Sequence, residues 1–151
     1  MANHVRQQIR EAIAAQLVGS ATTGNLVFQS RVKVLADSEL PALVVLTNQE
    51  SISVENIHPD PVLNRLLTLT VLAKAKATNN IDDVLDTIIK EVEIKLAGWQ
   101  GVPALNSLIG GLVLNSIDVE INADNETPVA EATIEFLVNY FTQASMPDVS
   151  I

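Results

Sequence analysis

The chain has 151 residues, and because single domains most often have roughly 100–150 residues, this length fits one domain. Apolar residues make up 48% of it but aromatic residues only 3%, so its core must be built from aliphatic side chains. The absence of cysteine excludes disulfides and a cysteine nucleophile, and the net charge of −9 argues against binding to DNA or RNA.

The first element is predicted to be a helix over residues 3–18, because apolar side chains recur every four residues. Asn3 is expected to cap its N-terminus and Gly19 to end it, and the small polar residues 20–25 then form a loop. The apolar stripe of this helix comprises Val5, Ile9, Ile13 and Leu17.

Over residues 26–34, apolar side chains recur every second residue, which predicts a half-buried strand. Arg31 and Lys33 lie on its polar side, so they are expected to form a basic outward face. A turn at residues 37–39 then leads to a buried strand over residues 42–46, where a run of apolar residues follows a proline.

Residues 47–61 are the least regular part of the sequence and are predicted to form a protruding loop or hairpin. Ile52 and Val54 could form a short edge strand within this stretch. Pro59 and Pro61 require an extended, non-helical exit, because the residue before a proline avoids the helical region.

A long central strand is expected over residues 62–77, where apolar residues lie on both faces. The clearest helix covers residues 81–97, with acidic residues in its first turn and lysines toward its C-terminal end, as the helix dipole favours. Asn80 is expected to cap this helix, and Gly98 to end it in the left-handed conformation.

Two alternating strands over residues 112–122 and 128–142 complete the predicted fold. The tail, residues 143–151, follows a single domain of residues 1–142 and is expected to be loose unless a partner binds it. The order of elements predicts an α/β (α+β) fold: a single-layer mixed, mostly antiparallel sheet with two main helices packed on it. The side chains expected to point inward are Val113, Ile117, Val119 and Ile121 on the first strand, and Ala130, Ala132, Ile134, Phe136, Val138 and Tyr140 on the second.

No catalytic, metal or cofactor motif is present in the sequence. His4 and His58 are the only histidines, and they are expected to be exposed rather than to bind a metal. A set of nucleophile, base and oxyanion donors cannot be assembled, so an enzyme is the least supported class. No apolar run is long enough to cross a bilayer, and the first residues do not form a signal peptide, which predicts synthesis in the cytosol.

Four acidic residues are expected to share one outward sheet face if the last two strands form a hairpin: Asp118, Glu120, Glu131 and Glu135. They could be a solvated surface, which is the usual role of such residues. They could also be an acid–base pair of the glycosidase type, although no aromatic sugar platform accompanies them. A third interpretation places them toward a neighbouring subunit's Arg31 and Lys33, or toward a channel.

The sequence resembles the tail terminator family of long-tailed bacteriophages, typified by minor tail protein U, over about residues 3–142. The resemblance rests on the first helix and on these segments: Thr22-Thr23-Gly24 before Leu26-Val27-Phe28, Glu39-Leu40-Pro41-Ala42-Leu43-Val44-Val45, Arg65-Leu66-Leu67-Thr68-Leu69-Thr70-Val71, Asp82-Asp83-Val84-Leu85-Asp86, and Ala132-Thr133-Ile134-Glu135-Phe136-Leu137-Val138-Asn139-Tyr140.

The resemblance implies a virion structural protein, assembled in the host cytoplasm, that forms a hexameric ring at the head-proximal end of the tail. Such a ring caps the tail tube, ends its polymerisation and binds a head-side connector or stopper protein. DNA passes through it without specific binding, because an acidic lumen repels phosphate. The residues expected at subunit interfaces or in the lumen are Arg31, Lys33, Glu50, Ile52, Val54, His58, Asp118, Glu120, Glu131 and Glu135.

Two alternatives remain open at the level of sequence. The first is another head–tail joining or tail-completion (neck) protein, because such proteins share this order of elements. The second is a small cytosolic ligand-binding module, which a stable monomer or dimer with a dry internal pocket would favour.

Overall fold

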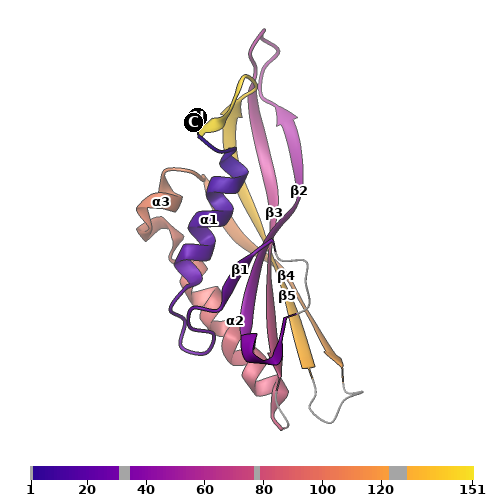
Figure 1. Ribbon diagram of the computed structural model, residues 1–151. Helices are drawn as coiled ribbons and strands as arrows, with labels where there is room; N and C mark the ends of the chain where they lie inside the picture. Colours follow the sequence, from indigo (N-terminus) through magenta and orange to yellow (C-terminus); the bar gives the residue numbers. More distant parts are fainter. Residues whose placement is uncertain (1, 31–34, 77–78, 123–128) are drawn as a thin grey trace.

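Among the described residues, one six-stranded sheet runs the length of the molecule, and the helices pack against one of its faces (Figure 1). The computed structural model describes residues 2–30, 35–76, 79–122 and 129–151. The strands lie in the order β1-β2-β3-β5-β4, with β6 beside β5, and all neighbours are antiparallel except β1 and β2. The predicted α+β fold, a mostly antiparallel mixed sheet with two main helices on it, is confirmed.

The elements have the following bounds. The strands are β1 Val27–Gln29, β2 Ala42–Val54, β3 Val62–Lys76, β4 Gly111–Asn122, β5 Val129–Gln143 and β6 Met146–Ser150. The helices are α1 Val5–Leu17, α2 Ile81–Ala97 and α3 Pro103–Asn106, with 3₁₀ turns η1 Asp37–Glu39 and η2 Trp99–Gly101. The sheet face that α1 and α2 cover is called the helix side, and the other face is called the open face.

The two main helices form where the apolar stripes predict them, and Asn80 and Gly98 occupy the predicted cap positions of α2, but the residue that caps α1 and the cap geometry of α2 differ from the prediction. α1 is capped by His4 rather than Asn3, because the His4 Nδ1 accepts a hydrogen bond of 3.0 Å from the backbone N–H of Arg6. Asn80 is in the left-handed conformation and makes no capping bond to α2, and Gly98 has a φ of −85°. Gly19, with a φ of 89°, does follow the end of α1 as expected.

β2 is much longer than the sequence predicts. It pairs with β3 in antiparallel register from Ala42 to Val54, with one irregularity between Thr47 and Gln49. The irregular polar sequence after Leu46 is therefore mostly strand, and only residues 55–61 form the turn. The far end of this hairpin, residues 51–65, projects past the helices and is called the β2–β3 arm (Figure 1).

The main core lies on the helix side of the sheet. The predicted alternation of β5 is confirmed, because its six inward side chains, from Ala130 to Tyr140, are at most 2% exposed. They pack with β3 and with the buried stripes of α1 and α2. A smaller cluster of Leu35, Ala42 and Val44 covers part of the open face near β2.

The C-terminal residues are held against the body of the protein. β6 pairs with the end of β5, where Thr142 lies opposite Ser150. The Ser150 hydroxyl donates a hydrogen bond of 2.6 Å to the Leu108 carbonyl, and Gln8 of α1 donates one of 2.9 Å to the Asp148 carbonyl. The expectation of a loose tail is therefore wrong, because three separate parts of the chain bind it.

Candidate functional site

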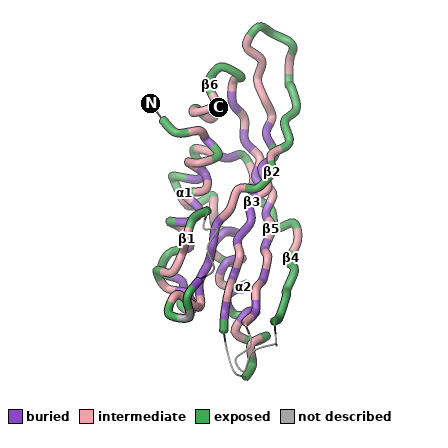
Figure 2. Tube along the Cα trace, turned by 45° about the vertical axis from the view of Figure 1, so that its right-hand side comes forward, coloured by how far each residue is buried: buried purple, intermediate pink, exposed green. Residues whose placement is uncertain are grey.

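β4 forms one edge of the sheet, and it exposes most of its apolar side chains (Figure 2). Val113, Ile117, Val119 and Ile121 are 60%, 37%, 49% and 42% exposed, so the prediction that they point into a core is wrong. Their register also differs from the expected one, because an irregularity between Leu114 and Ser116 places Val113 on the open face. The other three lie on the helix side, where no described helix covers them.

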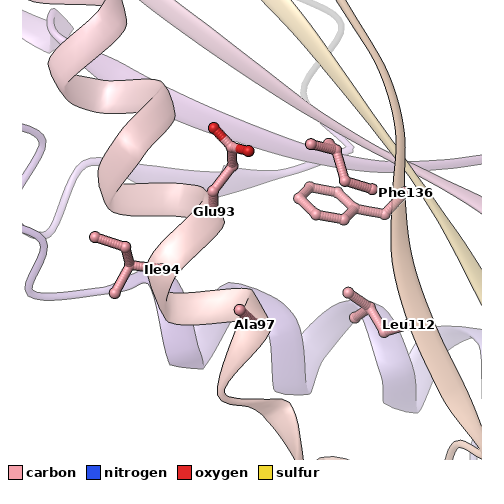
Figure 3. A pocket seen from close by; sticks show the side chains of 6 residues that line it. Glu93, Ile94, Ala97, Leu112 and Phe136 are labelled. Atoms are coloured by element: carbon pink, nitrogen blue, oxygen red, sulfur yellow. The ribbon is translucent and has the colours of Figure 1, made fainter.

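A groove separates the C-terminal half of α2 from β4 on the helix side (Figure 3). Its volume is about 370 Å³, and its lining comprises Glu93, Ile94 and Ala97 of α2 with Leu112, Leu114 and Phe136 of the two strands. Among the described residues of this lining, only Glu93 is charged, and Ile94 is itself largely exposed. Leu112 and Leu114 of this lining are followed on the helix side of β4 by the exposed Ile117, Val119 and Ile121.

The four acidic residues predicted to share a face do so, on the open face of the β4–β5 hairpin. Glu120 lies directly opposite Glu131, Asp118 opposite Thr133, and Ser116 opposite Glu135. Asp118 and Glu120 are exposed, and Glu131 and Glu135 are half-buried.

Two neighbouring side chains offset part of this negative charge. The Lys74 ammonium lies 3.4 Å from a carboxylate oxygen of Glu131, and the Asn115 amide donates a hydrogen bond of 2.8 Å to Glu135. The resulting surface is acidic and solvated, and its outer margin, at Asp118 and Glu120, carries the least compensated charge.

The β2–β3 arm exposes a second set of apolar residues, toward the opposite edge of the sheet from β4. Ile52 and Val54 are 52% and 56% exposed, and Ile57 in the turn is almost fully exposed. His58 is also exposed, at the tip. The turn of the arm is held by Asp60, which accepts hydrogen bonds from the backbone N–H and the hydroxyl of Ser145 at 2.8 and 2.6 Å.

Glu50 differs from the other predicted interface residues because its side chain is buried within the subunit. Its carboxylate accepts a hydrogen bond from the Tyr140 hydroxyl and one of 2.9 Å from Arg65, whose Nε donates to Thr142 at 2.9 Å. Burial and the bond to Glu50 raise the pKa of Tyr140 above its usual value. This cluster, which joins the arm to β5, was missed because the sequence does not show that Glu50 and Arg65 face each other.

His4 is half-buried rather than exposed as the sequence predicts. Burial and the nearby Arg6 and Arg65 guanidinium groups lower the pKa of His4. Within the described residues, no group of three or more His, Asp or Glu side chains could hold a metal ion, and no helix is long and apolar enough to cross a membrane. The predicted basic face at Arg31 and Lys33 lies outside the described residues.

Comparison with known proteins identifies a family for nearly the whole chain. A family model described as phage minor tail protein U matches residues 4–140. Among solved structures, a chain from a virion of a native gene transfer agent particle aligns with a TM-score of 0.43 and 14% sequence identity, covering 90% of this chain and 92% of that chain. No curated protein sequence matches the chain.

Proposed function

This chain belongs to the phage minor tail protein U family, and from that membership we propose that it is the ring-forming terminator of the tail tube. It is a structural protein of the phage tail and a component of the virion. In the proposed role, a hexameric ring caps the tail tube at its head-proximal end, ends tube polymerisation and binds a head-side connector or stopper protein. The protein acts by binding other subunits and has no catalytic function.

The observation that carries the proposal is the presence, on one subunit, of two different apolar surfaces that no other described residues cover. One is the helix side of β4 with its groove, and the other is the β2–β3 arm. A closed ring of identical subunits joins two different surfaces head to tail, whereas a two-fold dimer uses one self-complementary surface. Exposed apolar patches of this kind mark sites where proteins associate.

The acidic open face of the β4–β5 hairpin is a suitable lining for the ring lumen. Its four carboxylates repel DNA phosphates, so DNA can pass without adhering. The predicted roles of Arg31 and Lys33 as a basic counter-surface, and of His58 at a neighbour contact, remain part of this proposal. Residues 1–142 are proposed to act as one domain, to which β6 is attached.

The test is to measure assembly and tube length with the purified protein. We expect native mass spectrometry and electron microscopy to detect hexameric rings, alone or with the tail tube protein of the same phage. Adding the protein should stop tube growth. Substitution of Glu131 and Glu135 with Gln should alter ring assembly or the passage of DNA. Only monomers, even with tube protein present, would contradict the proposal.

A related neck protein would behave differently in the same assay. It would form rings that bind the head-side connector, yet it would leave the length of growing tubes unchanged. Tube length therefore separates the two functions, and a stable monomer with a bound small molecule would indicate a ligand-binding module.

A further inference from the structure

The first turn of α1 is capped by a titratable side chain. His4 precedes the helix, and its Nδ1 accepts a hydrogen bond of 3.0 Å from the backbone N–H of Arg6. Helices are most often capped by Ser, Thr, Asp or Asn, whose oxygen atoms remain acceptors when the pH falls. An imidazole nitrogen accepts such a bond only while it carries no proton, because a protonated imidazole has two N–H donors and no acceptor. The cap of α1 therefore exists only in the neutral form of His4.

The surroundings of this imidazole oppose its protonation. Burial, followed by the Arg6 guanidinium of α1 and the Arg65 guanidinium of β3, lowers the pKa of His4. The N-terminal end of the helix dipole also disfavours a cation. The first turn of α1 contains no acidic residue that would offset this positive potential.

Two carboxylates, on β2 and β6, act in the opposite direction. Glu50 and Asp148 favour the cationic form of His4, but they are the smaller contributions. The Glu50 carboxylate already accepts hydrogen bonds from Arg65, at 2.9 Å, and from the Tyr140 hydroxyl of β5. The folded protein therefore favours the neutral imidazole that the cap requires.

The capped turn also holds the middle of β6. The side-chain amide of Gln8, in this turn, donates hydrogen bonds of 2.6 Å to the Asn3 carbonyl and 2.9 Å to the Asp148 carbonyl. The pairs that β6 forms with β5 lie at its two ends, at Met146 and Ser150. The bond from Gln8 thus fixes the stretch between them to α1.

We propose that His4 is a pH-sensitive cap that controls the attachment of β6 to α1. When the imidazole is neutral, it closes the first turn of α1, and Gln8 in that turn holds the Asp148 carbonyl. When Nδ1 takes up a proton from solvent, the cap bond to Arg6 breaks, the turn loosens and the middle of β6 separates from α1. The proposal does not depend on the ring, because every contact that carries it lies within one subunit.

The pH range of this change follows from the direction of the pKa shift. The pKa of His4 is lower in the folded protein than the unfolded value of 6.5. The stability that the neutral cap contributes is therefore fully present above pH 6.5, and it is lost as the pH falls through the folded pKa. β6 should accordingly be held at neutral pH and released in mild acid.

The test measures the protonation of His4 and the attachment of β6 by mass spectrometry. Exchange of the imidazole C2 hydrogen gives the pKa of His4. Amide hydrogen exchange of residues 146–151, corrected for the intrinsic rate, reports how firmly β6 is held. We expect the pKa of His4 to lie below 6.5. The protection of residues 146–151 should fall several-fold between about pH 8 and about pH 5, two values on either side of the ordinary histidine pKa, with its midpoint at the pKa of His4.

Three variants separate His4 from other titrating groups. His4→Asn keeps a side-chain oxygen that caps helices but does not titrate, so its β6 should stay protected at both pH values. His4→Ala has no cap, so its β6 should be weakly protected at both. His58→Asn, at the exposed tip of the β2–β3 arm, is the matched control and should respond to pH as the wild type does. Circular dichroism verifies that each variant folds.

Four results would overturn the proposal. A pKa of His4 at or above 6.5 would show that the fold does not favour the neutral imidazole. Equal protection at both pH values in the wild type, or full protection in folded His4→Ala, would show that β6 does not depend on the cap. A fall in His4→Asn as large as that of the wild type would assign the response to a carboxylate such as Asp148. The wild type and His4→Asn decide the matter even if His4→Ala does not fold.

Discussion

β4 and β5 are neighbouring strands with nearly the same pattern of alternating apolar residues, yet they have opposite environments. The inward side chains of β5 are at most 2% exposed, whereas the apolar side chains of β4 beyond Leu112 are 37% to 60% exposed. β5 lies between β3 and β4 and packs under α2. Among the residues that the structure describes, β4 has a neighbouring strand on one side only, and α2 approaches it only at its first residues.

The difference shows what an alternating pattern can and cannot predict. Alternation indicates a strand and determines which residues share a face, because successive side chains point to opposite faces. It does not indicate whether the same chain supplies the cover for that face. The sequence of β4 has the apolar residues of a buried strand, but within the described chain nothing packs on them. Such exposed apolar side chains are expected on a surface that a partner protein covers.

The largest expected effect is the difference in the free energy of unfolding between a side-chain truncation on β5 and one on β4. Phe136→Ala removes a buried aromatic ring from β5, so it should lower the free energy of unfolding by about 3–5 kcal/mol. Val119→Ala on β4 should lower it by less than about 0.5 kcal/mol in the monomer, because Val119 is half exposed. Urea unfolding at a concentration where the protein is monomeric measures both. Equal losses would show that β4 is buried within the subunit.

The second effect compares a buried carboxylate with an exposed one. Glu50→Ala leaves the buried Arg65 guanidinium without its counter-ion, and breaking such a pair costs about 3 kcal/mol or more. Glu55→Ala, in the exposed turn of the β2–β3 arm, is the control and should change stability by less than about 0.5 kcal/mol. Chemical denaturation of both variants provides the measurement. A small loss for Glu50→Ala would mean that the cluster does not hold the arm to β5.

A third effect appears at alkaline pH and concerns β5 alone. Burial and the Glu50 carboxylate raise the pKa of Tyr140 above its unfolded value of 10.0. A raised pKa means that the neutral phenol stabilises the fold fully below pH 10, and that this stability is lost as the pH rises further. Tyr140 is the single tyrosine, so ultraviolet titration of phenolate absorbance reports it directly. Tyr140→Phe should unfold with a weaker dependence on alkaline pH than the wild type.

The smallest effect tests the acidic margin of β4. Glu120 lies directly opposite Glu131, and like charges in this arrangement destabilise the pair. Glu120→Gln should therefore raise the free energy of unfolding of the monomer by up to about 0.5 kcal/mol at low salt. Added salt should remove the gain, because it screens exposed charges. A loss of stability at low salt would indicate that Glu120 has a cationic partner.

The sequence predicted the elements whose apolar pattern is regular, and it failed where contacts between distant residues decide the structure. α2 and β3 have the predicted bounds to within a residue. In both, apolar residues follow a regular pattern, and the residue at which the pattern stops marks the end of the element. The second half of β2 has no such pattern and becomes a strand because β3 pairs with it. β6 forms for the same reason, through β5.

The candidate site was only partly predictable. The alternation placed Asp118 and Glu120 on one face, and the register with β5 confirmed it. The burial of Glu50 depends on Arg65 and Tyr140, which reach it from two other strands, and no local pattern shows this. The exposure of Val119 depends on where α2 ends its contact with the sheet, which periodicity alone does not determine.

The attachment of β6 to α1 brings the two ends of the chain to the same pole of the subunit, beside the base of the β2–β3 arm (Figure 2). A gold or fluorescent label fused to either end would therefore mark that pole and not the opposite one, where β4 ends and β5 begins. In electron micrographs of labelled tails, the position of the marker along the tail axis would report which pole of each subunit points toward the head. The position of the chain ends can therefore be used to determine how each subunit is oriented along the tail axis.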